Sequence, residues 1–421
     1  MFENEGQSCW ESTAQLPSFP ALDRSLEVDA VIVGGGIAGI TTAYLLKQAG
    51  LRVALLERRR CGSGQTGRST AHLTAIADQP LATLVDELGT ASARTLWEAG
   101  FAAVARVRAE IRDARINCQF AWVRGCLHAS SSDEVRQRAS LTEEAVAAHA
   151  LGIEAAYVDA VPGLGVPGVL FDGQARLHPL RYLTVLLESI DGNGSLVAEH
   201  TEVDRLDADR RVVYVGRHQV RAPFIFCATH VPLPDVLDLA PHLRSSLSTS
   251  TTYVVAGTAP QGPLDEGLYW EHRHRSYEYL RIDREDGQDD VVVFGGLDHP
   301  GDSAAAGDRY SRLERRLRQR LPGVRIEHRW SGTVVESVDG RPCIGEVAPG
   351  IYLAAGFGGN GMSYGTLAAM MAVEAVRGGR SAWADLFDPS RFSDHPREPD
   401  ASSAAAPSGH VTGRRPHATV A

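Results

Sequence analysis

The sequence predicts an α/β protein in which a Rossmann-like nucleotide-binding domain is interleaved with an α+β domain built on an antiparallel sheet. Two observations indicate the first domain: a strand–turn–helix–strand unit near the N-terminus, and the buried apolar strand Pro223–Thr229, which can return to the same sheet. The third observation is the period-2 alternation of residues 250–256 and 267–297, which is typical of antiparallel strands.

The strongest local signal is a glycine-rich turn that follows the apolar run Val31–Val33. Gly34, Gly36 and Gly39 stand at GxGxxG spacing ahead of a helical segment. The first glycine makes the tight turn, the second lets the backbone approach a pyrophosphate, and the third lets helix and strand pack closely. The spacing therefore predicts a phosphate-binding turn.

The segment after the glycines completes this unit. Its helix stops at Gly50, and a second apolar run ends in Glu57. The free N–H groups around Ile37 and Ala38, together with the positive end of the helix dipole, favour phosphate groups. Glu57 stands where an acid accepts both ribose hydroxyls of an ADP moiety. The sequence thus predicts that the chain binds a dinucleotide through ADP.

A loop of small and hydroxyl-bearing residues, 58–73, follows Glu57 directly. Small residues allow close packing against a planar ligand and its phosphates, so Arg58, Thr70, Ala71 and His72 are candidate contacts. A plain surface loop is the alternative. We favour the ligand because the loop leaves the ribose-binding strand.

A third glycine-rich turn lies near the C-terminus. The strand Ile351–Ala355 runs into Gly356–Gly361, and a helix follows from Met362 to about Val376. A second nucleotide site is disfavoured because no strand ending in an acid follows about twenty residues later. We instead expect this helix N-terminus to press against the redox ring of the cofactor.

The remaining segments predict the domain limits and the other elements. We expect an ordered N-terminal arm over 1–27, nucleotide-binding segments 28–78, 160–243 and 328–393, second-domain segments 79–159 and 244–327, and a disordered tail over 397–421. Further expectations are two helices within 80–115, a strand pair near Phe120–Ala129, an Ala-rich helix to about 151, a helix starting at His178–Pro179, a strand pair from Thr201–Leu206 and Arg211–Val215, and an Arg-rich helix over Asp308–Leu321 with a solvated face. The GxGxxG at Gly163–Gly168 contains Pro167 and precedes no helix, so we read it as a decoy.

Composition narrows the class of protein. The chain has 421 residues, 43% of them hydrophobic, which suits a globular protein with a sizeable core. A net charge of −10 argues against nucleic acid as a partner. The six cysteines show no metal-ligand spacing, and we expect neither a signal peptide nor a membrane span. We therefore expect a cytoplasmic protein without a metal site. Its only lysine, Lys47, is a poor candidate for catalysis.

Over about residues 8–393 the chain resembles the D-amino-acid-oxidase-type FAD oxidoreductases, which include glycine oxidase, sarcosine oxidase and the γ-glutamylputrescine oxidase group. The motifs that carry the resemblance are the N-terminal fingerprint, the Val203 strand, Asp339–Gly345 and the Gly356–Gly361 turn. It looks most like the branch whose members often carry a C-terminal Rieske iron–sulfur domain, to judge from Trp10, Thr66–Ala71, Gln174–Pro179 and Trp383–Arg391. The tail after Asp394 lacks cysteine, so we expect no Rieske domain here.

The resemblance implies an FAD-dependent oxidase or dehydrogenase that oxidises a C–N bond of an amine or amino acid by hydride transfer to flavin N5, with dioxygen or another acceptor taking the electrons. No acid–base side chain is mandatory if the amine binds in its neutral form, so no catalytic residue is assigned. The motifs and the resemblance together assign the cofactor contacts to Gly34, Gly36, Ile37, Ala38, Gly39, Glu57, Arg58, Thr70, Ala71, His72, Val203, Ala228, Gly356, Gly358, Asn360, Gly361 and Met362.

Departures from the family pattern indicate non-covalent FAD. Ser331, Gly332 and Thr333 occupy the neighbourhood in which some relatives place a flavin-linking cysteine. His72 could tether the flavin, as a loop histidine does in other relatives, but a non-covalent contact is the simpler role.

A flavin-binding subunit or electron-transfer component without stand-alone catalysis is the alternative function.

The expected substrate contacts lie on one predicted strand. Period 2 places Tyr277, Tyr279 and Arg281 on the same face. Guanidinium binds carboxylate in a bidentate manner, and the resemblance implies an arginine at this strand, so Arg281 is the candidate clamp for a substrate carboxylate. An exposed strand arginine is the alternative.

Overall fold

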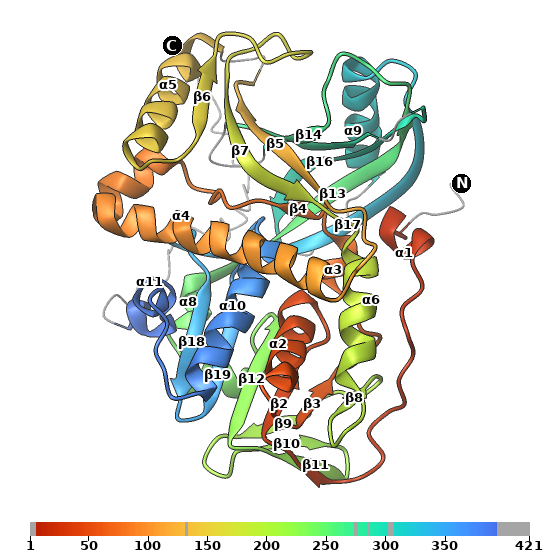
Figure 1. Cartoon of the computed structure of the whole chain (residues 1–421), viewed down its shortest axis with the longest axis vertical. Coiled ribbons are helices and arrows are strands. Elements are labelled where there is room, and N and C mark those ends of the chain that lie inside the picture. Colours follow the sequence, from red (N-terminus) through yellow and green to blue (C-terminus); the bar gives the residue numbers. More distant parts are fainter. Residues whose placement is uncertain (1–5, 131–133, 273–276, 285–286, 302–306, 394–421) are drawn as a thin grey trace, which may run out of the picture.

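The computed structural model describes residues 6–130, 134–272, 277–284, 287–301 and 307–393, which form three sheets and the helices around them (Figure 1). The predicted tail over 397–421 lies outside the described residues. No helix in the described part of the chain is both long and apolar to the degree that crossing a membrane requires.

The six-stranded sheet is the predicted Rossmann-like core. Its strands run in the order β18 (Cys343–Ala348), β19 (Ile351–Ala355), β12 (Phe224–His230), β2 (Ala30–Val33), β3 (Val53–Leu56) and β8 (Leu196–Ala198). All neighbours are parallel except β18 and β19. Because β12 returns between β2 and β19, the ends of these three strands meet at one edge, where the two glycine turns begin.

Both faces of this sheet are covered, which explains its continuous apolar strands. On one face, α2 (Ile37–Gln48) packs between α6 (Pro179–Ile190) and α10 (Gly361–Val376) (Figure 1). On the other face, Val31 and Val33 belong to a hydrophobic cluster that also contains residues of a four-stranded sheet. That sheet has the order β1 (Leu26–Glu27), β11 (His218–Arg221), β10 (Val212–Val215) and β9 (Arg205–Asp207).

The large sheet forms the other half of the molecule, as predicted for a domain built on antiparallel strands. Its order is β17 (Arg325–Ser337), β13 (Leu247–Ala259), β16 (Asp290–Pro300), β15 (Tyr279–Asp283), β14 (Gly267–Glu271), β5 (Ala121–His128), β7 (Gly168–Arg176) and β4 (His72–Leu73), with β6 (Ala155–Val158) paired to β7. Only β14 and β5 pair in parallel. The helices α5 (Glu134–Ala150) and α9 (Gly307–Arg320) lie on this half (Figure 1).

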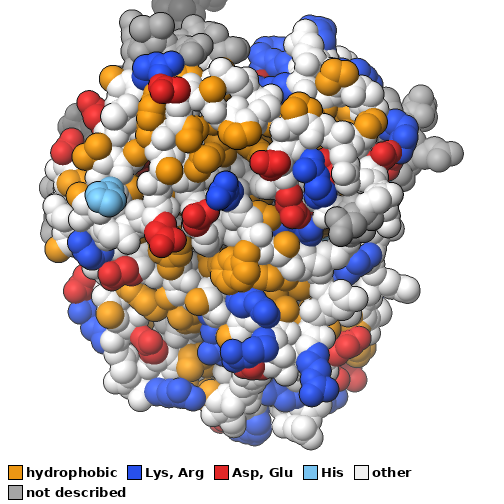
Figure 2. Space-filling model, turned by 45° about the horizontal axis from the view of Figure 1, so that its top comes forward, with side chains coloured by type: hydrophobic (Ala, Val, Ile, Leu, Met, Phe, Trp, Pro, Cys, Tyr) orange, Lys and Arg blue, Asp and Glu red, His pale blue; other side chains and the backbone are white. Residues whose placement is uncertain are grey.

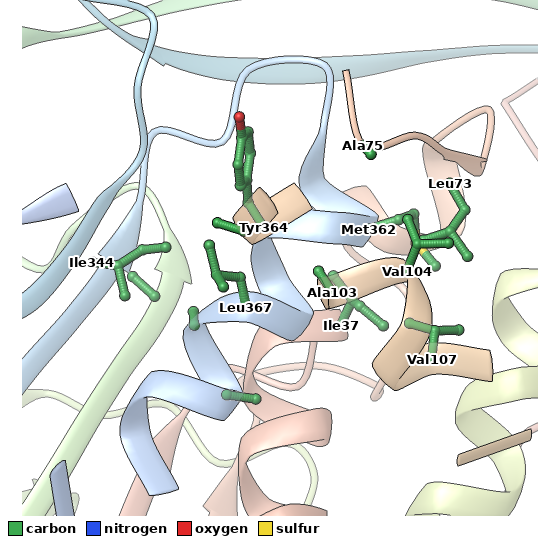
Figure 3. Packing of buried hydrophobic residues seen from close by; sticks show 14 of the residues in the cluster. Ile37, Leu73, Ala75, Ala103, Val104, Val107, Ile344, Met362, Tyr364 and Leu367 are labelled. Carbon is green, nitrogen blue, oxygen red and sulfur yellow. The ribbon is translucent and has the colours of Figure 1, made fainter. Parts of the chain in front are cut away.

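The long helix α4 (Leu81–Asp113) joins the two halves (Figure 1). Gly89 has φ 78° and breaks it, which agrees with the two helices predicted within 80–115. Its C-terminal part packs on α10, and Ala103, Val104, Met362 and Leu367 belong to one buried cluster (Figure 3). The half built on the six-stranded sheet and the half built on the large sheet therefore share one hydrophobic core.

The described part of the N-terminal arm begins at Gly6, and some of its residues are buried. Ser8 and Glu11 form a capping box at the start of α1 (Cys9–Thr13). Trp10 is only 4% exposed and lies in a cluster with Trp330 and Val293 of the large sheet. The short elements α3 (Gln65–Arg68), α7 (Pro234–Leu239), α8 (Leu243–Ser246), α11 (Ala384–Phe387) and the 3₁₀ turn Pro389–Phe392 complete the described fold.

Two local predictions were wrong because pairing partners lie far away in sequence. The segment Phe120–Ala129 forms one strand, β5, rather than a pair. Val203 lies outside any strand, since the pair near it consists of β9 and β10. The domain limits stay a prediction, although β7 and most of β17, from segments expected in the nucleotide-binding domain, pair within the large sheet. The helix α9 also differs from the prediction, since its Arg316 and Arg320 pair with Glu278 instead of facing only solvent.

Candidate functional site

The glycine turn after β2 requires glycine at two positions. Gly34 has φ 110°, and a methyl group there would overlap the carbonyl oxygen of Ala228 on β12. A methyl group at Gly39 would overlap the carbonyl oxygen of Gly34. The first turn of α2 therefore sits directly on the strand ends, as a nucleotide-binding turn requires.

The N-terminus of α2 is open to an anion. Its first turn carries no acidic residue, and Gly36 at the N-cap supplies no capping side chain. The Ile37 N–H donates to Thr66 Oγ1 at 2.9 Å. A methyl group at Gly36 would lie 3.2 Å from the same hydroxyl, so the glycine keeps the backbone bare at this point. These groups fit a pyrophosphate, which the remaining N–H groups and the helix dipole would hold.

Glu57 lies at the end of β3, beside this turn. Its Oε2 accepts from the Gly35 N–H at 2.7 Å and its Oε1 from the Arg59 N–H at 2.8 Å, so the carboxylate is held in place. A carboxylate offers about four lone-pair sites, which leaves capacity for two ribose hydroxyls. The Thr201 N–H donates to the Glu57 carbonyl at 2.8 Å and so brings Val203, 9% exposed, to the same edge.

The segment 62–78 connects this helix N-terminus with that of α10. It touches α2 through Thr66, and farther along the Ser363 hydroxyl in the first turn of α10 donates to the Thr74 carbonyl at 2.5 Å. At its end, Asp78 accepts from the Gly359 N–H at 2.7 Å and from Asn360 Nδ2 at 3.0 Å. A dinucleotide that spans the two helix ends would therefore lie along this segment.

The first turn of α10, like that of α2, carries no acidic residue. Gly356 and Gly358 have φ 72° and 56°, which turns the chain from β19 into α10. A methyl group at Gly365 would lie 3.0 Å from Ile37 Cγ2, so α10 approaches the start of α2 closely. Figure 3 shows Ile37 and Met362, near the starts of the two helices, in the same packed core.

Asp78 was missed by the sequence reading, although it holds the Gly358–Asn360 turn. Its side chain reaches solvent, but the surrounding protein removes much of the water around it. This desolvation, together with the carboxylate of Glu336, raises the pKa of Asp78 to about 7. A methyl group at Gly359 would come within 3.1 Å of Tyr277 Oη, so the phenol lies at the same turn.

A further acid lies on the large sheet next to the predicted tyrosines. Tyr279 Oη and Thr252 Oγ1 are 2.6 Å apart, and Asp298 follows on the adjacent strand β16. The register of β13 and β16 shifts between Thr251 and Tyr253, and this irregularity leaves Leu297 and Asp298 unpaired with β13. Burial raises the pKa of Asp298, while the Asp78 carboxylate and burial raise that of Tyr277.

His72 starts β4 on the same segment. Its Nδ1 lies 2.9 Å from Thr70 Oγ1, and its ring centroid lies 6.1 Å from that of Tyr279. Desolvation and the nearby Arg281 cation lower the pKa of His72 to about 3, so the imidazole is neutral at physiological pH. The loop 58–73 thus places Thr70, Ala71 and His72 at the site, while Arg58 remains exposed.

Arg281 does not have the environment expected of a carboxylate clamp. Its Nε and Nη2 donate to the two oxygens of Asp283, each at 2.7 Å, and its side chain is only 1% exposed. Its Nη1 donates to the carbonyls of Thr70 and Ala71. The guanidinium fork of Arg281 is therefore already occupied by the carboxylate of Asp283 on the same strand. The alternative, an exposed strand arginine, is also wrong, because the side chain is buried. Tyr277 and Tyr279, by contrast, lie beside Asp78 and Thr252.

Lys47 has a structural role. Its Nζ donates to the carbonyls of Ile190, Asp191 and Gly192 at 2.6, 3.0 and 3.0 Å, where α6 ends. A cation at a helix C-terminus satisfies carbonyls that have no intrahelical partner. The only lysine therefore caps α6 from the last turn of α2, at the opposite end of that helix from the glycine turn.

Comparison with known proteins decides the family. The model of the FAD dependent oxidoreductase family matches residues 29–375, which include both helix N-termini and the segment between them. The chain belongs to the FAD dependent oxidoreductase family. FAD is accordingly its cofactor, and the glycine turn, Glu57 and the start of α10 are the parts of this family member that fit it.

Individual relatives agree with this assignment. Over 402 residues the chain is 30% identical to YhfW of Bacillus subtilis, which is named as a Rieske 2Fe-2S iron-sulfur protein. The match covers 93% of this chain and 76% of that protein. It is 26% identical to the gamma-glutamylputrescine oxidoreductase of Escherichia coli, with 90% and 89% of the two chains covered.

Solved structures show the same fold. Glycine oxidase from Geobacillus kaustophilus superposes with a TM-score of 0.69 at 18% identity, covering 87% of this chain and 99% of that one. L-proline dehydrogenase from P. horikoshii gives 0.68 at 17% identity, with 89% and 99% covered. At these identities the likeness establishes the fold of the oxidoreductase and not its substrate.

Proposed function

We propose that this oxidoreductase oxidises a C–N bond of an amine or amino acid, with FAD bound non-covalently along the segment 62–78. The observation that carries the proposal is the pairing of two open helix N-termini, at Ile37 and Gly361, joined by that segment. When bound, FAD supplies the electron sink by accepting a hydride at N5. The chain itself contributes binding, orientation and electrostatics.

The roles of the protein groups follow from their positions. The start of α2 holds the pyrophosphate, and Glu57 holds the ribose. The N-terminus of α10 places a positive dipole end where the reduced ring would carry negative charge. His72 would contact the bound cofactor as a neutral imidazole and add no charge, because its pKa is lowered to about 3.

The charges near Tyr277 favour recognition of an amino group. Tyr277 Oη lies at the turn that Asp78 holds, and the carboxylates of Asp78, Asp298 and Glu336 all raise the pKa of Tyr277. The nearby guanidinium of Arg281 is neutralised by Asp283 at 2.7 Å. A carboxyl group near a phenol suits an ammonium ion, because both oxygens can accept hydrogen bonds from its N–H groups. The names of the relatives, gamma-glutamylputrescine oxidoreductase and glycine oxidase, support the same substrate class.

An anaerobic titration of the holoenzyme with amines and amino acids tests the proposal. At least one compound should bleach the visible absorbance of the oxidised flavin, and Asp78→Asn should raise the concentration that gives half-reduction. Asp86→Asn, at an exposed position of α4, is the matched control and should behave as wild type.

The second candidate is a flavin subunit that passes electrons to a partner, and the likeness to YhfW favours it. Dithionite would then reduce the flavin while no amine in the panel does. Reoxidation by air, compared with reoxidation by an artificial acceptor, separates oxidase from dehydrogenase. The cytoplasmic location stays a prediction.

A further inference from the structure

Four successive backbone carbonyls, those of residues 68–71, each accept a hydrogen bond from a side chain remote in sequence. Trp330 Nε1 donates to the Arg68 carbonyl at 2.7 Å, and Trp10 Nε1 donates to the Ser69 carbonyl at 2.8 Å. Arg281 Nη1 donates to the carbonyls of Thr70 and Ala71 at 3.1 and 2.8 Å. The donors come from β17, α1 and β15, so three parts of the fold converge on one turn.

This turn has a backbone shape that needs external support. Ala71 has φ 53°, in the left-handed region that an alanine rarely occupies, and its side chain is buried. Locally, the turn is stabilised by the Ala71 N–H, which donates to Ser69 Oγ at 2.9 Å. A sparsely populated conformation persists where the surrounding structure over-determines it, and the three side chains provide that constraint.

Arg281 is arranged as a rigid donor. Asp283 binds its Nε and Nη2 at 2.7 Å each, which leaves Nη1 directed at the turn. Its guanidinium carbon lies 4.8 Å from the centre of the Trp10 ring, so the two donors also stack on each other. Lysine could not reproduce this geometry, because it lacks the planar fork.

We propose that Trp10, Trp330 and Arg281 form a carbonyl clamp that fixes the turn 68–71 in the shape against which the flavin is positioned. The inference rests on the proposed function, because it takes FAD to lie along segment 62–78. The clamp acts through the turn: Thr70, Ala71 and His72 follow its shape, and none of the three clamp side chains needs to touch the cofactor. They are therefore positioning residues.

The test compares clamp variants with variants that lose a similar group elsewhere. Trp10→Phe removes one N–H and keeps an aromatic ring, while Arg281→Met removes the fork. Trp97→Phe is the control for an indole, since Trp97 is 1% exposed and its Nε1 has no hydrogen-bond partner among the described residues. Arg284→Met is the control for the ion pairs, because the Arg284 fork binds the carboxylate of Asp290 at 3.1 and 2.9 Å and donates to the Leu264 carbonyl rather than to the turn.

FAD titration of each apoprotein, the visible circular dichroism of the bound flavin and thermal unfolding of the apoproteins are measured together. We expect the Kd for FAD to rise about 2- to 10-fold in Trp10→Phe, the range for one neutral hydrogen bond. In Arg281→Met, which loses the charge-assisted donor to two carbonyls, we expect a rise of about 10- to 150-fold. The circular dichroism of the bound flavin should change in both. The two controls should keep the wild-type Kd within about twofold and the wild-type dichroism, even where they lower the unfolding temperature.

Wild-type Kd and dichroism in Trp10→Phe would overturn the clamp, including the case in which Arg281→Met does not fold. Controls that shift the flavin signals as strongly as the clamp variants would also overturn it, because the effect would then be one of general stability. These failures leave FAD binding by the wild type intact. A wild-type protein that binds no FAD would instead overturn the proposed function together with the clamp.

Discussion

Replacing Glu57 by alanine removes the carboxylate that we assign to the ADP ribose. Hydrogen bonds to a charged group contribute about 1.5–3 kcal/mol, and every 1.4 kcal/mol is tenfold in affinity, so the Kd for FAD should rise about 10- to 150-fold. Part of this loss comes from the protein itself, since Glu57 also accepts from the Gly35 and Arg59 N–H groups at 2.7 and 2.8 Å. Glu57→Gln keeps one carbonyl acceptor and should lose less.

Fluorescence titration of the apoprotein with FAD measures this effect, because bound and free flavin differ in emission. Glu202→Ala is the matched control, since Glu202 is an exposed acid on the neighbouring segment. Its affinity should equal that of the wild type. Unchanged affinity in Glu57→Ala would show that the end of β3 does not hold the ribose, and the assignment of the strand would be refuted.

Three further predictions concern the cofactor and Asp78. Acid precipitation should release FAD into the supernatant, because Ser331–Thr333 offer no tether; flavin in the pellet would point to His72. Gly39→Ala should abolish FAD binding in equilibrium dialysis, since its methyl group would overlap the Gly34 carbonyl oxygen, and retained binding would contradict the close packing. The pKa of Asp78 is raised from 3.8 to about 7 in the folded state, so folding favours the protonated acid and the wild type loses stability as pH rises from about 4 to about 7. The unfolding temperature of Asp78→Asn should therefore rise relative to that of the wild type across this window, and a constant difference would contradict the raised pKa of Asp78.

The nucleotide-binding half was predictable because its signals are local. The glycines at Gly34–Gly39 impose a turn and a close helix through backbone geometry alone, whatever the rest of the chain does. The same holds for His178, which accepts from the Arg181 N–H at the start of α6. Both features depend only on a few consecutive residues, so they can be predicted from the local sequence.

The membership of strands in sheets was not predictable in this way. β7 and β17 have the same local pattern in either sheet, and only distant partners decide. Asp78 illustrates the same limit for the site, because its partner Asn360 lies far along the chain and no motif links them. The role of Arg281 did leave a signal: Asp283 stands two residues later on the same strand face, and an acid in that position pairs with the arginine.

The most direct test of C–N oxidation is a single-turnover experiment on the holoenzyme. An amine that bleaches the flavin is mixed anaerobically in two forms, with hydrogen or with deuterium on the carbon next to nitrogen. Hydride transfer predicts slower bleaching of the deuterated form and one carbonyl product per flavin reduced, since water hydrolyses the imine. Bleaching without carbonyl product, or no bleaching by any amine while dithionite still reduces the flavin, would contradict the assignment.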